Sequence, residues 1–418
     1  MKILIIGGGG REHAIAWKLS NENNVKTIYC APGNAGISEV AQCIDINDSN
    51  IEELLNFAKD NQIDLTIVGP EVPLVKGIVD EFEKEGLKIF GPNKECSQLE
   101  GSKAFSKDFM IRHNIPTAKY KEYTNIDEAI AEIDNFGYPL VIKADGLAAG
   151  KGVVIPQNRE EAIATLNEMM RDKKFGNAGE KIVIEEFLKG IETSILAFVD
   201  NNTIIPMVSA KDHKKVYNHE QGPNTGGMGT FSPSEIYTDK LAKEIEANVL
   251  KATLEGFKKD ELDYKGILFI GLMITEDGAK VLEYNVRFGD PETQSVLFRL
   301  KTDLHKIMES ILDNKLNEIK IEYKKEEAVC VMLTSGGYPD VYEKGKLIKG
   351  LSELDKDIVI FHSGTKILDG KLVTNGGRVL GITTSANTVE EAATKVYNNI
   401  KKISFEGMHY RTDIGTGI

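Results

Sequence analysis

Apolar and polar residues alternate in two rhythms along the first hundred positions. Short apolar runs, which are typical of buried strands, are separated by stretches in which apolar residues recur every three or four positions, as on one face of a helix. The pattern predicts strands at residues 3–6, 25–30, 65–68 and 88–90, and helices at residues 11–20 and 51–59. Strand and helix in this succession favour a parallel sheet with helices on both faces.

The rhythm changes after Gly91-Pro92-Asn93. A helix predicted at residues 101–113 leads into a small α/β unit at residues 121–190, where Thr124 and Asp127 have the spacing of a helix-capping pair. Within this unit the pattern predicts helices at residues 124–135 and 160–171, and strands at residues 139–144, 153–155 and 182–187.

The remaining chain mixes strands and helices. The pattern predicts strands at residues 193–199, 203–210, 266–274 and 279–288, and helices at residues 239–258 and 292–312. From residue 326 onward it predicts several short strands, a hairpin turn at Asp369-Gly370, and a last helix that Thr388 and Glu391 would cap.

The strand predicted at residues 279–288 carries polar groups at alternating positions. Glu283, Asn285 and Arg287 would face one side of the strand. The other side would present an apolar set to a core, namely Leu282, Tyr284 and Val286. A carboxylate and an amide oxygen suit a hard divalent ion such as Mg²⁺, and a guanidinium beside them suits an anion with several oxygens. This strand therefore predicts a site for metal-assisted phosphate chemistry.

The composition indicates a folded, soluble protein of several domains. With 418 residues, 41% hydrophobic and 28% charged, the chain exceeds one ordinary core. Its net charge of −13 would repel nucleic acid and anionic membranes, so we expect neither as a partner. The four cysteines form no CxxC pair, the N-terminal apolar run is too short for a signal peptide, and no apolar run could span a membrane. We therefore expect a cytoplasmic protein with reduced cysteines.

Residues 143–154 form a glycine-rich loop between two predicted strands, with Lys143 and Lys151 near its ends. Gly150 and Gly152 would let backbone N–H groups approach phosphate oxygens. The loop is not a Walker A motif, because a glycine and a β-branched run follow Lys151 in place of Ser or Thr and a helix. Protein kinases use a similar flap, but the chain has no His-Arg-Asp catalytic loop. A plain glycine turn would not need two lysines, so a phosphate-binding flap is favoured.

A second candidate segment ends the strand at residues 182–187. Glu185 and Glu186 are followed by Phe187 and Leu188, and Glu192 lies close behind. These residues alone fit two interpretations equally well. One is a strand end that reaches solvent, and the other is a hinge whose backbone holds an adenine while Glu192 reaches a ribose hydroxyl.

A third segment is a charged run with a glycine-rich continuation. Lys211 and Asp212 lie in the run, and Gly226 and Gly227 follow it. A charged run is usually a solvated face, but an acid inside a basic run, followed by glycines that can approach a ligand, favours a substrate loop.

The glycines at residues 7–10 follow the first predicted strand and open a helix. They do not complete a dinucleotide fingerprint, because Glu12 or His13 stands where the third glycine belongs. A helix N-terminus beneath glycines still binds phosphate, so we expect a phosphate-bearing ligand here. The candidates at this edge of the sheet are Gly9, Gly10, Arg11, Glu12, Pro70 and Glu71.

Together these segments resemble the ATP-grasp ligases, and most closely the family of glycinamide ribonucleotide synthetases. The resemblance covers the whole chain and is most specific at the Arg-Phe-Gly-Asp-Pro-Glu run of residues 287–292. It implies a multidomain α/β and α+β fold: a Rossmann-like N-terminal domain at 1–101, an ATP-grasp central domain at 102–120 and 191–325, its lid at 121–190, and a mixed α/β C-terminal domain at 326–418. It also implies a monomer or weak homodimer that uses ATP and Mg²⁺ or Mn²⁺ to join glycine to 5-phosphoribosylamine, the second step of purine synthesis.

The resemblance also assigns roles to residues. Glu283 and Asn285 would bind the metal, and Arg287, Asp212 and Lys143 would act in catalysis. ATP would be bound by Lys103, Lys143, Gly150, Lys151, Gly152, Glu185, Glu186, Phe187, Leu188 and Glu192. The other substrates would be bound by Gly9, Gly10, Arg11, Glu12, Pro70, Glu71, Lys211, Asp212, Gly226, Gly227, Arg287, Asp290 and Glu292.

The residue types and the resemblance together predict a mechanism. No Ser-His-Asp or Cys-His set is evident, so we expect no covalent enzyme intermediate. The resemblance implies that glycine attacks the γ-phosphate and that the sugar amine then displaces phosphate from glycyl phosphate.

Three alternative functions compete with this one: another ATP-grasp ligase such as a biotin carboxylase or a carboxylating purine enzyme, a nicotinamide-dependent dehydrogenase, and a nucleotide sensor without catalysis. Residues 287–292 argue against the first, the incomplete fingerprint against the second, and metal ligands beside an arginine against the third.

Overall fold

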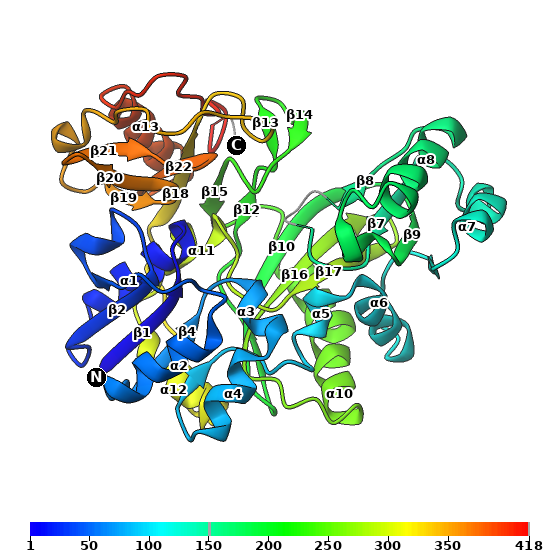
Figure 1. Ribbon diagram of the computed structural model, residues 1–418, viewed down its shortest axis with the longest axis horizontal. Coiled ribbons are helices and arrows are strands. Elements are labelled where there is room, and N and C mark those ends of the chain that lie inside the picture. The colour runs from blue at the N-terminus through cyan, green and yellow to red at the C-terminus, as the bar shows by residue number, and fades with distance from the viewer. Residues whose placement is uncertain (149–151, 417–418) are drawn as a thin grey trace.

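The computed structural model describes residues 1–148 and 152–416. Figure 1 shows the N-terminal and C-terminal sheets on one side of the molecule, a long central sheet in the middle, and a small sheet with its helices on the far side. The mixed α/β architecture and the parallel N-terminal sheet confirm the fold class predicted from the sequence. No helix in the described ranges is long and apolar enough to cross a membrane.

The N-terminal sheet is parallel throughout, in the order β3-β2-β1-β4-β5. Its central strand β1 (Lys2–Gly7) is buried almost from end to end, because helices cover both faces of the sheet. The carboxyl ends of β1 and of its neighbours meet at one edge, where open α/β sheets bind ligands. The other strands are β2 (Thr27–Pro32), β3 (Gln42–Cys43), β4 (Leu65–Val68) and β5 (Ile89–Phe90), and the α-helices are α1 (Gly10–Ser20), α2 (Ile51–Asp60), α3 (Glu71–Lys76), α4 (Ile78–Lys84) and α5 (Gln98–Gly101).

The central sheet is antiparallel, in the order β11-β10-β16-β17. It shares its cores with the N-terminal sheet: Leu4 packs in one cluster with Leu268, and Ile5 packs in another with Phe269. The two sheets are therefore joined by continuous apolar packing. The strands are β10 (Ile191–Val199), β11 (Ile204–Pro206), β16 (Gly266–Thr275) and β17 (Gly278–Asn285), and the α-helices are α6 (Lys103–Arg112), α9 (Asp239–Ile245), α10 (Lys251–Lys259), α11 (Glu292–Arg299) and α12 (Leu304–Leu312).

The small sheet is antiparallel, in the order β6-β9-β7-β8. It has a core of its own, in which Leu140 and Ile184 pack against Ala129 and Leu166 of the covering helices. Its elements are β6 (Tyr120–Tyr123), α7 (Ile126–Glu132), β7 (Leu140–Ala144), β8 (Val153–Val154), α8 (Arg159–Leu166) and β9 (Ile182–Glu186).

The C-terminal sheet has the order β12-β15-β18-β22-β19, so two of its strands come from the middle of the chain. The predicted domain limits stay a prediction, but this sheet crosses them, because β12 (Lys211–Asp212) and β15 (Gly229–Ser232) were assigned to the central domain. The remaining elements are the hairpin β13 (Lys215–Tyr217) and β14 (Gln221–Asn224), then β18 (Glu327–Thr334), β19 (Val359–His362), β20 (Thr365–Leu368), β21 (Lys371–Thr374), β22 (Arg378–Ala386) and α13 (Val389–Ile400).

The single helix predicted at residues 292–312 is wrong, because the chain breaks between α11 and α12. Leu300 leaves the helix in an extended conformation and bridges to Tyr323. The new helix is then capped from a distance: the carboxylate of Glu22 accepts hydrogen bonds from the backbone N–H groups of Leu304 at 2.6 Å and His305 at 3.2 Å. A carboxylate at a helix N-terminus satisfies free N–H groups and the helix dipole.

The turns, helix caps and strand limits predicted from short sequence segments are confirmed only in part. The turn at Asp369-Gly370 is confirmed, with both residues at positive φ, and Thr388 caps α13 by accepting from the N–H of Glu391. The capping residue of α7 is Asn125 instead of Thr124. The strand predicted at residues 203–210 is regular only over β11, and the segment between the charged run and Gly226 contains the strand β14.

Candidate functional site

The predicted metal ligands lie at the end of β17. The Oε2 of Glu283 is 3.0 Å from the Nζ of Lys103, and its Oε1 accepts a hydrogen bond from Asn285 at 3.4 Å. The Lys103 ammonium, helped by Lys214 and Lys143, holds the pKa of Glu283 well below its usual range, although burial opposes this. An ionised carboxylate and an amide oxygen therefore stand together where a hard cation could be held.

The donor set fits Mg²⁺ or Mn²⁺ if the nucleotide supplies the other ligands. Within residues 1–148 and 152–416, no group of three His, Cys, Asp or Glu side chains could hold a metal ion on its own. One or two protein oxygens plus substrate phosphates are the usual arrangement for Mg²⁺ in phosphate chemistry.

A bulge in β17 alters the predicted alternation. Glu283 pairs with Gly271 of β16, but Val281 pairs with the very next residue, Leu272, so Leu282 is an extra residue. Tyr284 and Val286 enter the core as predicted, whereas Val281 enters it in place of Leu282. The bulge leaves the carbonyl of Leu282 free to accept a hydrogen bond from Lys143 at 3.2 Å.

Lys143 is the second cation near β17, and it also contacts the predicted hinge. Its Nζ lies 2.8 Å from Oε1 of Glu185, a side chain that is only 2% exposed. Glu186 is tied to the root of the small sheet, because it accepts from the N–H of Lys119 at 3.0 Å. Leu188 is buried and Phe187 is half-buried. Gly150 and Lys151 lie outside the described residues, and Gly152 is buried beside Ala144.

Arg287 is held between two acidic side chains of the N-terminal region. Its guanidinium lies 3.0 Å from Glu100 and 3.5 Å from Glu71. Glu100 also accepts from the N–H of Val286 at 2.7 Å, so it holds both the guanidinium and the backbone that precedes it. The structure thus joins Glu71, after β4, to the end of β17, as expected for residues of one site.

The loop after β1 reaches the same place through Arg11. This side chain donates to the carbonyl of Phe288 at 3.1 Å and pairs with Glu12 at 2.7 Å, while Glu12 accepts from the N–H of Gly9. Glu12 is buried over Gly69, where an added methyl would lie 2.0 Å from its Oε1, and Pro70 follows directly. Arg11 and Glu12 therefore hold the loop. Because the N–H of Gly9 is bound to Glu12, the N–H of Gly10 at the start of α1 is the better phosphate-binding candidate of the two.

An acidic pair forms the wall of the site that faces the C-terminal sheet. Burial, and then the charge of Glu292, raise the pKa of Asp212 well above its usual value; burial likewise raises the pKa of Glu292. No described residue makes a hydrogen bond to the buried Oδ1 of Asp212. Lys214 pairs with Glu192 beside them. Two carboxyl groups that ionise reluctantly would gain a favourable partner from a bound ammonium group.

Arg378 links this wall to the glycine loop. It donates to the carbonyls of Gly226 at 2.6 Å and Asp290 at 2.7 Å, and its guanidinium lies 3.0 Å from the Asp290 carboxylate. Asp290 also accepts from Gln294 at 2.7 Å. An added methyl on Gly227 would lie 2.7 Å from the Oδ1 of Asp212, so that loop and carboxylate are in direct contact.

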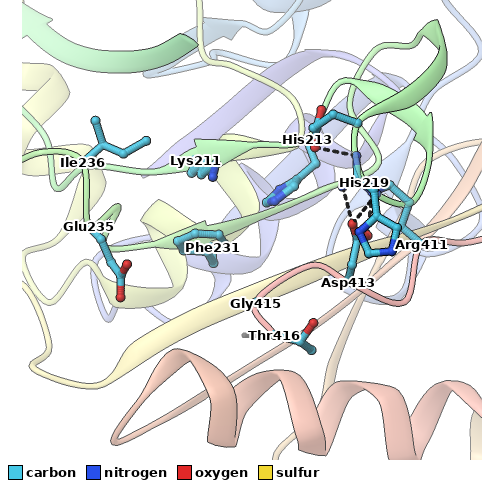
Figure 2. A pocket seen from close by; sticks show the side chains of 11 residues that line it. Lys211, His213, His219, Phe231, Glu235, Ile236, Arg411, Asp413, Gly415 and Thr416 are labelled. Atoms are coloured by element: carbon cyan, nitrogen blue, oxygen red, sulfur yellow. Dashed lines mark hydrogen bonds and ion pairs between the residues drawn. The ribbon is translucent and has the colours of Figure 1, made fainter. Parts of the chain in front are cut away.

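Among the described substrate-binding candidates, Lys211 does not join this cluster. It points to the opposite side of β12 from Asp212, into a cavity of about 330 Å³ that it lines with His213, Phe231 and Arg411 (Figure 2). Its Nζ lies 6.0 Å from the centre of the Phe231 ring.

Four contact residues were missed as site candidates. Lys107 lies one turn after Lys103 on α6, so helical spacing could have indicated it. Lys214 belongs to the same charged run as Lys211, and its position two residues after Asp212 was the available signal. Glu100 and Arg378 carry no local signal, because they reach the site only through the tertiary fold.

Comparisons with known proteins cover the whole chain. Residues 1–100, 101–293 and 328–417 match the N domain, the ATP-grasp (A) domain and the C domain of phosphoribosylglycinamide synthetase. The phosphoribosylamine–glycine ligase of Caldanaerobacter subterraneus is 51% identical over 417 residues, which is 100% of each chain. The enzyme of the same name from Halalkalibacterium halodurans is 50% identical over 100% of this chain and 97% of its own.

Solved structures agree with these matches. The crystal structure of phosphoribosylamine–glycine ligase from Thermotoga maritima superposes with a TM-score of 0.86 at 35% identity, covering 99% of this chain and 100% of that one. The biotin carboxylase of Campylobacter jejuni shares the fold alone, with a TM-score of 0.77 at 14% identity over 98% of this chain and 92% of that one. The chain therefore belongs to the phosphoribosylglycinamide synthetase family.

Proposed function

We propose that the chain is a ligase that uses ATP to join glycine to 5-phospho-β-D-ribosylamine, giving the ribosylglycinamide, ADP and phosphate. The observation that carries the proposal is the meeting of three regions just after β17. Arg11 and Glu71 come from helices that follow strands of the N-terminal sheet, Glu283 comes from the central sheet, and Asp212 of the C-terminal sheet lies close to Glu292. The full-length relatives bearing the name of this activity support the same assignment.

The nucleotide would lie between the small sheet and β17. Lys103 and Lys143 would neutralise phosphate oxygens, Glu186 to Leu188 would meet the adenine, and Glu192 would reach the ribose. Glu283 and Asn285 would hold Mg²⁺ or Mn²⁺, which, when bound, would add positive charge against the phosphates. Lys103 already rests against Glu283, so phosphate and metal would be bound side by side.

Glycine would lie between Asp212 and Arg287. Its ammonium group would satisfy the buried Oδ1 of Asp212, and Arg287 would stabilise the charge that develops as the glycine carboxylate attacks the γ-phosphate. The product of this step is glycyl phosphate and ADP. The amine of phosphoribosylamine, held at Gly9, Gly10 and Asp290, would then attack the acyl carbon and release phosphate. Since no nucleophilic side chain is required, the protein acts by positioning and by charge.

An omission assay tests this proposal. ADP release is measured with ATP, a divalent metal, glycine and freshly made phosphoribosylamine, each left out in turn, and with bicarbonate in place of glycine. ADP release that requires glycine and the amine supports the ligase. Stimulation by bicarbonate would instead indicate a carboxylating enzyme, like the biotin carboxylase that shares this fold.

Isotope labelling tests the intermediate. If glycine carries ¹⁸O in its carboxylate, one labelled oxygen must appear in the released phosphate, because that oxygen bridges carbon and phosphorus in glycyl phosphate. Phosphate without label would contradict this mechanism. We further propose a cytoplasmic enzyme that acts as a monomer or weak homodimer, which sedimentation at several concentrations can test.

A further inference from the structure

Lys107 of α6 is a buried cation to which nothing above assigns a role. Its side chain is 3% exposed, and its Nζ lies 3.0 Å from Oε2 of Glu185. The Nζ of Lys143 lies 2.8 Å from the other oxygen of the same carboxylate, an ion pair that lacks hydrogen-bond geometry. Glu185 is therefore clamped between two lysines, one from α6 and one from β7.

A second contact connects Lys107 to the strand of the metal ligands. Its Nζ donates to the hydroxyl of Thr117 at 2.7 Å, and this hydroxyl donates its only proton to the carbonyl of Val281 at 2.6 Å. The neighbouring carbonyl, that of Leu282, accepts from Lys143. Of the two carbonyls at the bulge of β17, that of Leu282 is therefore bound directly by Lys143, and that of Val281 is linked to Lys107 through Thr117.

The charges in this cluster do not balance. Two ammonium groups and one carboxylate are all less than 10% exposed, which leaves one positive charge in a region screened from water. Such an excess favours an anion nearby, and burial lowers the pKa of Lys107 to about 8, although Glu185 opposes that shift. With Lys143 alone, Glu185 would form a neutral pair and would compete with a phosphate for the lysine.

We propose that Lys107 is a positioning residue for nucleotide binding. By occupying Oε2 of Glu185, it keeps the charge of Lys143 available to the phosphates, and through Thr117 it fixes the root of the small sheet to β17. This inference rests on the proposed use of ATP. It does not require Lys107 to touch the nucleotide.

A double-mutant cycle in the full-length protein tests it. The variants are Lys107→Met, Glu185→Gln and the two combined, and the measurements are the Kd for ADP with Mg²⁺, by calorimetry, and KM for ATP with kcat. We expect Lys107→Met to weaken ADP binding about tenfold and to raise KM far more than it lowers kcat. Adding Glu185→Gln should restore at least about half of the lost affinity on a logarithmic scale, because it frees Lys143.

The opposite pattern overturns the proposal. If the double variant binds ADP as weakly as Lys107→Met or more weakly, Lys107 does not act through Glu185. Lys107→Arg keeps the charge and should retain affinity within about threefold of the wild type; loss equal to that of Lys107→Met, with an unchanged melting temperature, would also exclude the charge-based role.

Two controls complete the design. Lys121→Met removes an exposed lysine–glutamate pair from β6 of the same small sheet and should leave ADP affinity unchanged. ADP binding needs neither glycine nor phosphoribosylamine. A failure of this inference therefore stays distinct from a failure of the ligase proposal, which the wild-type omission assay decides.

Discussion

Replacing Gly227 with alanine should remove most activity while leaving the fold intact. Gly227 has a φ of +115°, a region that residues with a side chain rarely adopt, and an added methyl would lie 2.4 Å from Cδ of Pro291 and 2.7 Å from Oδ1 of Asp212. The backbone strain costs about 1–3 kcal/mol and the overpacking about another 1–3 kcal/mol. The lower limits of these two costs add to about 2 kcal/mol. The loop can avoid this cost only by moving away from Asp212.

That sum sets the expected effect. If the displaced loop cannot bind glycine, kcat/KM for glycine should fall at least about thirtyfold, since each 1.36 kcal/mol is a factor of ten. The assay is coupled ADP release against glycine concentration at saturating ATP. Gly370→Ala is the matched control, because it has a positive φ of +71° and no atom within 4 Å of the added methyl, far from the site. A Gly227→Ala enzyme within about threefold of wild-type kcat/KM would refute the reasoning.

Three further predictions concern the charged groups. Arg287→Ala should lower kcat on the order of a thousandfold, and near-normal turnover would remove this residue from the site. Glu283→Gln should raise the metal concentration for half-maximal activity by about tenfold or more; unchanged metal dependence would exclude it as a ligand. Because burial raises the folded-state pKa of Asp212, its contribution to stability is present below the unfolded pKa of about 4 and is lost as pH rises through the folded value. Asp212→Asn should therefore raise the melting temperature of the substrate-free protein at pH 7 and abolish glycine-dependent turnover, and a lower melting temperature would contradict that sign.

Features that depend on neighbours in sequence were predictable. The parallel N-terminal sheet follows from apolar runs at a regular spacing, and the turn at Asp369-Gly370 follows from residues that tolerate positive φ. Alternation along β17 correctly placed Tyr284 and Val286 in the core and set Glu283 apart from them. In each case the signal and the structure span the same few residues.

Features that depend on distant partners were not predictable. The break after α11 relies on Glu22, which lies at the other end of the chain, and apolar spacing alone continues smoothly across residues 300–303. The bulge at Leu282 depends on the pairing of β17 with β16. Because of it, Val281 faces the core in place of Leu282. The partners of Arg287 and Asp290, namely Glu100 and Arg378, were hidden for the same reason. Lys211 and Asp212 were predicted to act together, but they face opposite sides of β12.

Two strands of the C-terminal sheet come from the middle of the chain, and this limits how the protein can be divided into fragments. Asp212 lies on β12, which is supported by β15, and β15 is paired at four positions with β18 of the C-terminal sheet. A fragment cut near residue 325 would retain both short strands and lose their partner, leaving a bare ribbon that is marginal in water and exposes an edge prone to aggregation. Chimeras that exchange only the central nucleotide-binding region would lose the same strand pairing. The C-terminal sheet therefore has to be exchanged together with β12 and β15.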